Sequence, residues 1–290
     1  MGVGDDCALL RPDAGLELAV TTDLLVEGRH FAAGAEPRAL GHKALAVNLS
    51  DLAAMGAAPR WALLALALPS ADEAWLAAFS KGMFALADRF GVELVGGDTV
   101  GAAQIAICIT ALGEVPAGVA LYRAGAQAGD DLWVSGELGG AALALSRPDI
   151  ASAAKRLHQP EPRVELGERL RGLAHAAIDV SDGLVGDLGH ILERSGVGAL
   201  VQYRDIPRDA AFRNLKDEAL ERDCVLSGGD DYELLFTAAP AQRREIEALS
   251  RELGLRLTLI GAIQKGAPAL QVLDAGGKRI EPRRAHDHFA

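Results

Sequence analysis

Apolar and polar residues along the first part of the chain follow patterns that predict strands and helices in turn. Residues 16–22, LELAVTT, alternate in polarity and end in β-branched residues, as strands do. Residues 43–60 are nearly all small and apolar, which predicts a tightly packed helix that ends at Gly56. The apolar run 61–68 predicts a buried strand, and residues 73–90 place apolar side chains at helical spacing. This succession indicates an α/β protein.

A second series of strands and helices follows the segment 113–118, GEVPAG, which we take as the domain boundary. It divides the chain into residues 1–115 and 116–290. Ahead of it, residues 92–95 predict a strand that delivers the triplet 96–98, Gly-Gly-Asp. The other predicted strands are 104–112, 132–135, 176–180, 255–261 and 269–273, and the predicted helices of the second part are 164–173, 184–194 and 242–253.

Composition narrows the classes of function. The chain has 290 residues, 50% of them hydrophobic, and a formal net charge of -11. So acidic a chain is not expected to bind nucleic acid through a broad electrostatic surface, whereas acidic residues gathered at one place would suit divalent metal ions. No apolar run approaches the ~20 residues of a membrane-spanning helix, and no leader-like segment follows Met1. We therefore expect small-molecule partners and contact with neither nucleic acid nor membrane.

The cysteines indicate the compartment. Cys7, Cys108 and Cys224 are widely spaced, odd in number and show no CxxC pattern. We therefore expect neither a disulfide framework nor a zinc site, and a reducing cytoplasm as the location.

One carboxylate, Asp51, interrupts the small-residue helix. No Lys or Arg lies within a turn of it, because Lys43 is two turns back. Burying an ionised carboxylate without a partner is unfavourable. Asp51 therefore either faces water beside Ser50 or points into a site that holds a cation, and the rest of the chain must decide between these alternatives.

Other carboxylates share this setting of strand ends, glycines and small residues. Capping of the helix 184–194 by Ser181 or Asp182 would explain one of those two residues, but it does not explain Asp179. Carboxylate and hydroxyl oxygens with little His or Cys suit Mg²⁺, which binds through one or two carboxylates plus substrate phosphates. The pattern predicts magnesium-dependent phosphate chemistry without naming the substrate. The residues concerned are Asp5, Asp6, Asp23, Asp51, Asp98, Asp179 and Asp182.

Seven motifs, in this order and at these intervals, resemble those of the thiamine-monophosphate kinase family. That family belongs to the aminoimidazole-ribonucleotide synthetase-like superfamily, and the resemblance covers essentially the whole chain. The motifs are GVGDDCALL, TTDLLVEGRHF, KALAVNLSDLAAMGA, GGDT, IDVSDGL, LSGGDDYEL and the terminal DHF.

The resemblance implies a fold and an activity. The fold would be two-domain α/β (α+β), with an N-terminal sheet that pairs with its twin in a homodimer and a C-terminal α/β domain. The active sites would lie in clefts between the domains. The activity would be direct, in-line transfer of the γ-phosphoryl group of ATP to thiamine monophosphate, without a phosphoenzyme.

The resemblance also implies roles for individual residues. Several Mg²⁺ ions would be bound by Asp6, Thr21, Thr22, Asp23, Asp51, Asp98, Asp179 and Asp182. ATP would be contacted by Gly97, Asp98, Arg123 and Ser181. Thiamine monophosphate would meet His30, Asp230 and His286, and the catalytic set would be Asp51, Asp98, Arg123 and Asp182.

The sequence departs from the family pattern at three places. The family usually has some two dozen residues before the GDD motif, where this sequence starts. Asp230 stands where the family has Glu, and His286 stands where it has an aromatic residue. We expect the shorter side chain to be tolerated and the imidazole to weaken substrate binding.

Other readings remain open at this point. One is an aminoimidazole-ribonucleotide or selenophosphate synthetase, although Cys7 lacks the nearby Lys of the latter. Others are a non-catalytic nucleotide or metal sensor with the same fold, and a merely structural dimer.

Overall fold

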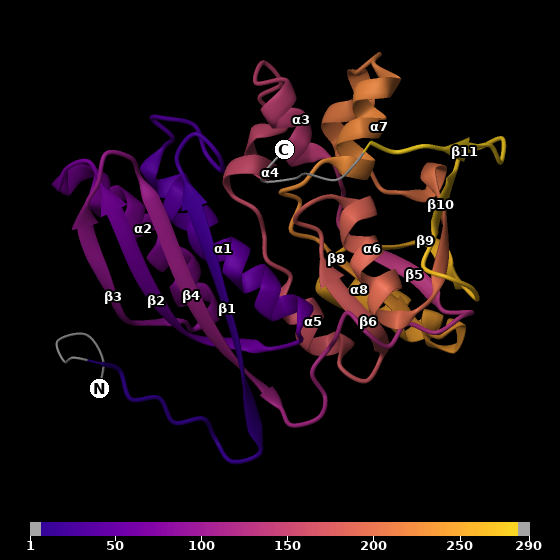
Figure 1. Cartoon of the computed structure of the whole chain (residues 1–290), viewed down its shortest axis with the longest axis horizontal. Helices are drawn as coiled ribbons and strands as arrows, with labels where there is room; N and C mark the ends of the chain where they lie inside the picture. Colours follow the sequence, from indigo (N-terminus) through magenta and orange to yellow (C-terminus); the bar gives the residue numbers. More distant parts are fainter. Residues whose placement is uncertain (1–6, 284–290) are drawn as a thin grey trace.

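The first half of the chain forms a four-stranded mixed sheet with two helices on one face (Figure 1). The structure, a computed structural model, describes residues 7–283. In the strand order β1-β4-β2-β3, β2 and β3 are parallel and the other neighbours are antiparallel. The elements are β1 (Leu16–Val26), α1 (Pro37–Ala54), β2 (Ala58–Leu68), α2 (Glu73–Phe90), β3 (Glu93–Gly101) and β4 (Ala106–Pro116).

The second half forms a seven-stranded sheet in the order β11-β10-β7-β9-β5-β8-β6, in which β7 and β10 are parallel. Its strands are β5 (Asp131–Ser135), β6 (Ala174–Asp179), β7 (Gly198–Gln202), β8 (Leu234–Ala238), β9 (Leu257–Gln264), β10 (Leu270–Leu273) and β11 (Arg279–Ile280). Its helices are α3 (Gly140–Ser146), α4 (Ala154–His158), α5 (Val164–Leu170), α6 (Leu184–Ser195), α7 (Glu218–Ser227) and α8 (Arg243–Leu253). Short 3₁₀ turns occupy Tyr203–Asp205, Ala210–Asn214 and Pro240–Gln242. Within the described residues, no helix has both the length and the apolar character needed to cross a membrane.

Helix α1 lies between the two sheets and is buried along almost its whole length (Figure 1). Small residues permit this close packing. A Cβ atom at Gly41 would lie 2.1 Å from the carbonyl oxygen of Phe79 in α2. A Cβ atom at Gly167 of α5 would lie 2.0 Å from the carbonyl oxygen of Ala53. Because backbones meet directly on both sides of α1, this helix fixes the position of one half relative to the other.

The structure confirms the α/β class and the helix at 73–90, but several strands run further than the sequence predicted, among them the two that carry site residues, β1 and β3. β1 continues through Asp23 to Val26, because Asp23 stays paired with Ile109 of β4. β3 includes the triplet 96–98, which pairs with β2. These residues therefore lie within strands and not in turns that follow them.

Candidate active site

Adjacent residues of α1 contact one strand from each sheet. The hydroxyl of Thr21, on β1, donates a hydrogen bond to the Asp51 carboxylate. The hydroxyl of Ser50 donates to Asp179 Oδ2 at 2.7 Å, at the end of β6. The packing of α1 between the sheets thus brings together side chains that lie 30 and 129 residues apart along the chain.

Burial raises the pKa values of the carboxylates gathered here, and the charge of Asp51 adds to the shift at Asp23 and Asp179. Burial, and then the charge of Asp51, raise the pKa of Asp23 from 3.8 to about 6. Burial, followed by the charge of Asp51, raises the pKa of Asp179 to about 8. Burial also raises the pKa of Asp51, although the Thr21 hydrogen bond and the charge of Arg123 oppose this shift. Three carboxylates lie close together and are largely shielded from water. This arrangement favours the interpretation that Asp51 faces a cation and not bulk water.

The chemistry of this donor set fits Mg²⁺. Among residues 7–283, no three Asp, Glu, His or Cys side chains converge tightly enough to form a complete metal cage. Mg²⁺ does not need one, because it keeps several waters and binds through one or two carboxylates plus substrate phosphates. Carboxylates whose ionisation is disfavoured by burial and mutual repulsion gain from such a cation.

A cavity of about 630 Å³ opens beside these carboxylates, between the two halves of the chain. This volume is in the range of small-molecule sites. Its lining combines apolar side chains with acids and with two arginines that can meet phosphate charge. The polar residues among those that line it are Thr21, Asp51, Tyr122, Arg123, Asp179 and Arg194.

The turn that carries Ser181 and Asp182 is fixed by a residue that sequence reasoning missed. Asp187, in the first turn of α6, accepts hydrogen bonds from the backbone N–H groups of Ser181 at 3.0 Å and Asp182 at 3.1 Å. Neither Ser181 nor Asp182 caps α6, whose N-cap is Gly183, so the capping interpretation of these residues was wrong. Burial is the largest cause that raises the pKa of Asp187, to about 7. The sequence did contain a signal for this contact, because Asp187 is an acidic residue in the first turn of the predicted helix 184–194.

Asp230 joins the second half of the chain to α1. Its carboxylate accepts a hydrogen bond from the buried ammonium of Lys43 at 2.9 Å and from the Tyr232 hydroxyl at 2.9 Å. Sequence reasoning missed Lys43 as a partner, because 187 residues separate it from Asp230. A lysine inside an otherwise apolar helix was the available signal, because a buried ammonium needs an acceptor.

Gly97 and Asp98 lie apart from the Asp51 carboxylate within one chain. Across the sheet, Asp98 of β3 pairs with Ala65 of β2, Ala65 pairs with Cys108 of β4, and Cys108 pairs with Leu24 of β1, so three strand spacings separate Asp98 from β1. That spacing corresponds to roughly 14 Å. Gly97 packs so closely on β2 that a Cβ atom would lie 1.8 Å from the Leu64 carbonyl oxygen.

The remaining predicted site residues have varied positions. Thr22 faces away from α1, and its hydroxyl lies 3.0 Å from that of Thr110. His30 follows β1, and its Nδ1 accepts a hydrogen bond from the Val26 N–H at 3.0 Å. Asp6 and His286 lie outside the described residues.

Comparisons with known proteins agree with this arrangement of two halves. Residues 4–115 match the family model "AIR synthase related protein, N-terminal domain", and residues 127–272 match its C-terminal domain. The thiamine-monophosphate kinase of Salmonella typhimurium is 42% identical over 299 residues, which span 100% of this chain and 92% of the relative.

Two solved structures extend the comparison. The crystal structure of thiamine-monophosphate kinase from Stenotrophomonas maltophilia superposes with a TM-score of 0.90 at 49% identity, covering 97% of this chain and 92% of the other. A structure described as "AaThiL complexed with AMPPCP and TMP" superposes with a TM-score of 0.83 at 31% identity, covering 96% and 89%. The chain belongs to the AIR synthase related family and, within it, to the thiamine-monophosphate kinases.

Proposed function

We propose that this chain transfers the γ-phosphoryl group of ATP to thiamine monophosphate, forming ADP and thiamine diphosphate. The observation that carries the proposal is the shared group of carboxylates. Asp51 of α1 accepts a hydrogen bond from Thr21 of the first sheet, and its neighbour Ser50 donates one to Asp179 of the second sheet. A cavity large enough for a small-molecule ligand opens beside these residues.

The magnesium ions would be held by carboxylates and hydroxyls of both halves. Bound Mg²⁺ would neutralise phosphate charge and align the two reactants. Thr21, Asp23, Asp51 and Asp179 are members of this set that lie together within one chain. The full proposed set is Asp6, Thr21, Thr22, Asp23, Asp51, Asp98, Asp179 and Asp182.

The acceptor needs charge screening more than it needs a general base. A phosphate monoester has a second pKa of about 6, so it is largely a dianion at neutral pH. Arg123 borders the cavity, and its charge opposes the rise that burial causes in the pKa of Asp51. Its guanidinium is suited to bind phosphate oxygens of ATP, with Gly97, Asp98 and Ser181 as the other proposed contacts.

The thiamine monophosphate site would include His30, Asp230 and His286. The carboxylate of Asp230 is held in place by Lys43 and Tyr232. Its negative charge suits the positively charged thiazolium ring of the acceptor.

We also propose a homodimer formed through the first sheet. The face of that sheet away from α1 exposes a set of large apolar side chains, and Asp98 lies on the same face, so a partner subunit seated there would enclose it. The exposed apolar residues are Leu18, Val20, Leu24, Leu63 and Val100. We place the domain boundary between residues 115 and 116, and the protein in the cytoplasm.

Measurement of ADP and thiamine diphosphate formation tests the proposed reaction. We expect both products in equal amounts when ATP, Mg²⁺ and thiamine monophosphate are present, and neither when Mg²⁺ is removed. Turnover with aminoimidazole precursors in place of thiamine monophosphate would instead indicate the synthetase. Tight ATP binding without turnover of any acceptor would indicate the sensor.

A further inference from the structure

The loop that carries Asp230 has an unusual backbone and is bonded directly to the Asp179–Asp182 turn. Asp230 and Tyr232 have φ angles of +66° and +50°, in the left-handed region that non-glycine residues rarely adopt. The Asp230 N–H donates to the Ser181 carbonyl at 2.8 Å, and the Tyr232 N–H donates to the Val180 carbonyl at 2.8 Å. The proposed acceptor site and the proposed nucleotide site therefore share one hydrogen-bonded unit, whose shape depends on an unfavourable backbone being held in place.

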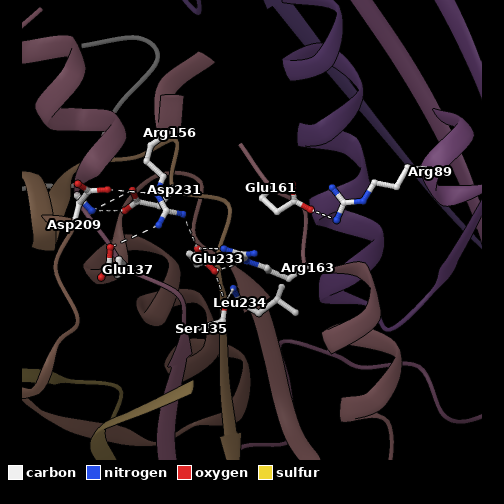
Figure 2. A network of polar contacts seen from close by, with 11 residues as sticks. Arg89, Ser135, Glu137, Arg156, Glu161, Arg163, Asp209, Asp231, Glu233 and Leu234 are labelled. Atoms are coloured by element: carbon white, nitrogen blue, oxygen red, sulfur yellow. Dashed lines mark hydrogen bonds and ion pairs between the residues drawn. The ribbon is translucent and has the colours of Figure 1, made fainter. Parts of the chain in front are cut away.

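Glu233 lies at the end of this loop and is anchored by several hydrogen bonds. Its side chain is 1% exposed and accepts hydrogen bonds from the Ser135 hydroxyl at 2.6 Å and from Arg163 Nε at 2.7 Å, with a second bond from the same guanidinium. Its backbone carbonyl accepts from the Val180 N–H at 2.8 Å. Figure 2 shows the Arg163 guanidinium directed at this carboxylate, with Arg156 on the other side. A bidentate arginine pair of this kind fixes orientation as well as charge.

Arg163 connects the loop to the helices of the first half. It ends the segment 159–163 between α4 and α5, and Glu161 in this segment forms an ion pair with Arg89 of α2 (Figure 2). The Pro160 carbonyl accepts a hydrogen bond from His42 Nε2 of α1 at 2.8 Å. The pair thus joins the loop to a segment that is already attached to α1 and α2.

We propose that Arg163 and Glu233 are positioning residues, whose buried ion pair holds the 230–233 loop so that Asp230 keeps its place relative to α1 and to the 179–182 turn. Neither residue lines the cavity beside the carboxylates. The ion pair acts through Asp230, and this role rests on the proposed phosphorylation of thiamine monophosphate.

The chain contains a matched control for a merely structural ion pair. Asp131, at the opposite end of β5 from Ser135, is buried and binds Arg243 through two hydrogen bonds, one of them 2.7 Å long. Asp131 has the same bidentate geometry, with a more exposed arginine, and it pairs with Ala238 at the end of β8 that lies away from Glu233 and the loop. Asp131→Asn therefore reports the effect of losing a buried carboxylate without disturbing Asp230.

The test compares Glu233→Gln with Asp131→Asn in steady-state kinetics. We expect Glu233→Gln to raise the KM for thiamine monophosphate at least tenfold, with a smaller change, under threefold, in the KM for ATP. Asp131→Asn should lower the melting temperature and leave both KM values within twofold of wild type. Equal KM effects in the two variants, or an unchanged KM for thiamine monophosphate in Glu233→Gln, would overturn the proposal.

A second variant and a second readout keep the result interpretable. If Glu233→Gln does not fold, Glu233→Gln combined with Arg163→Met removes both charges and should fold, with the same rise in KM. Hydrogen exchange of the Asp230 and Tyr232 amides reports the loop without any substrate. We expect faster exchange at both amides in the Glu233 variant than in Asp131→Asn, and unchanged exchange would overturn the proposal even if the wild-type chain proves inactive on thiamine monophosphate.

Discussion

Replacing Asp179 by asparagine should stabilise the magnesium-free protein at alkaline pH while abolishing its activity. Asp179 is 3% exposed, and burial together with the charge of Asp51 raises its pKa from 3.8 to about 8. Between these two values the unfolded chain has lost the proton that the folded chain still binds. Stability therefore falls as pH rises from about 4 to about 8, and it is fully retained only below this interval.

The size of the effect follows from the width of that interval. Each pH unit corresponds to about 1.4 kcal/mol, so the span from 3.8 to about 8 sets an upper limit of about 6 kcal/mol. Asparagine has the same shape, still accepts the Ser50 hydrogen bond and carries no charge at any pH. Allowing for relaxation and water entry, we expect a gain of about 1–4 kcal/mol at pH 8, which is roughly 3–10 °C in melting temperature.

Thermal melts in EDTA at pH 5, 6.5 and 8 provide the assay. The melting temperature of the wild-type protein should fall across this series, and that of Asp179→Asn should change much less. Asp131→Asn is the control. It should lower the melting temperature, because it removes a buried carboxylate that is paired with Arg243. Our reasoning about the site is refuted if Asp179→Asn melts below wild type at pH 8, or if both proteins show the same dependence on pH.

Three further predictions concern the metal, the helix packing and the dimer. Mg²⁺ should raise the wild-type melting temperature more at pH 8 than at pH 5, because Asp23, with a pKa of about 6, and Asp179 hold protons at pH 5. An equal rise at the two pH values would argue against these residues as ligands. Gly167→Ala should lower the free energy of unfolding by about 1–3 kcal/mol in urea titrations, because the new Cβ atom would meet the Ala53 carbonyl. Gly189→Ala in α6 is the control and should cost less, because its Cβ meets nothing within 4 Å and its φ is not in the left-handed region. Val20→Asp should convert a dimer into monomers in light scattering at micromolar concentration, and a persistent dimer would mean that the open face of the first sheet is not the interface.

Local sequence patterns predicted the elements whose limits are set locally. The helix at 73–90 has apolar side chains at regular helical spacing and ends at Gly91, which adopts the left-handed conformation. The ends of β1 and β3 were placed too early, because Asp23 and the glycines before Asp98 have turn-like preferences. Pairing with β4 and β2 overrides those preferences, and such pairing cannot be read from a single strand.

The sequence identified which types of residue form the site, but not which residues pair with one another. Asp23, Asp51 and Asp179 were grouped because carboxylates in small-residue surroundings need a cation, and the fold does bring them together. The partners Lys43 of Asp230 and Arg163 of Glu233 were missed. Each pair joins segments at least 70 residues apart, and only the packing of α1 and of the 159–163 segment against the loop reveals them.

We propose that carboxylates from both halves of the chain hold magnesium beside the phosphates of two reactants. Crystals grown with Mn²⁺ and AMPPCP test it most directly, because Mn²⁺ replaces Mg²⁺ and gives an anomalous signal. We expect anomalous peaks at about 2.0–2.2 Å from oxygens of Asp51 and of Asp23 or Asp179. Peaks only at other sites, with nucleotide bound and these carboxylates bare, would contradict the account.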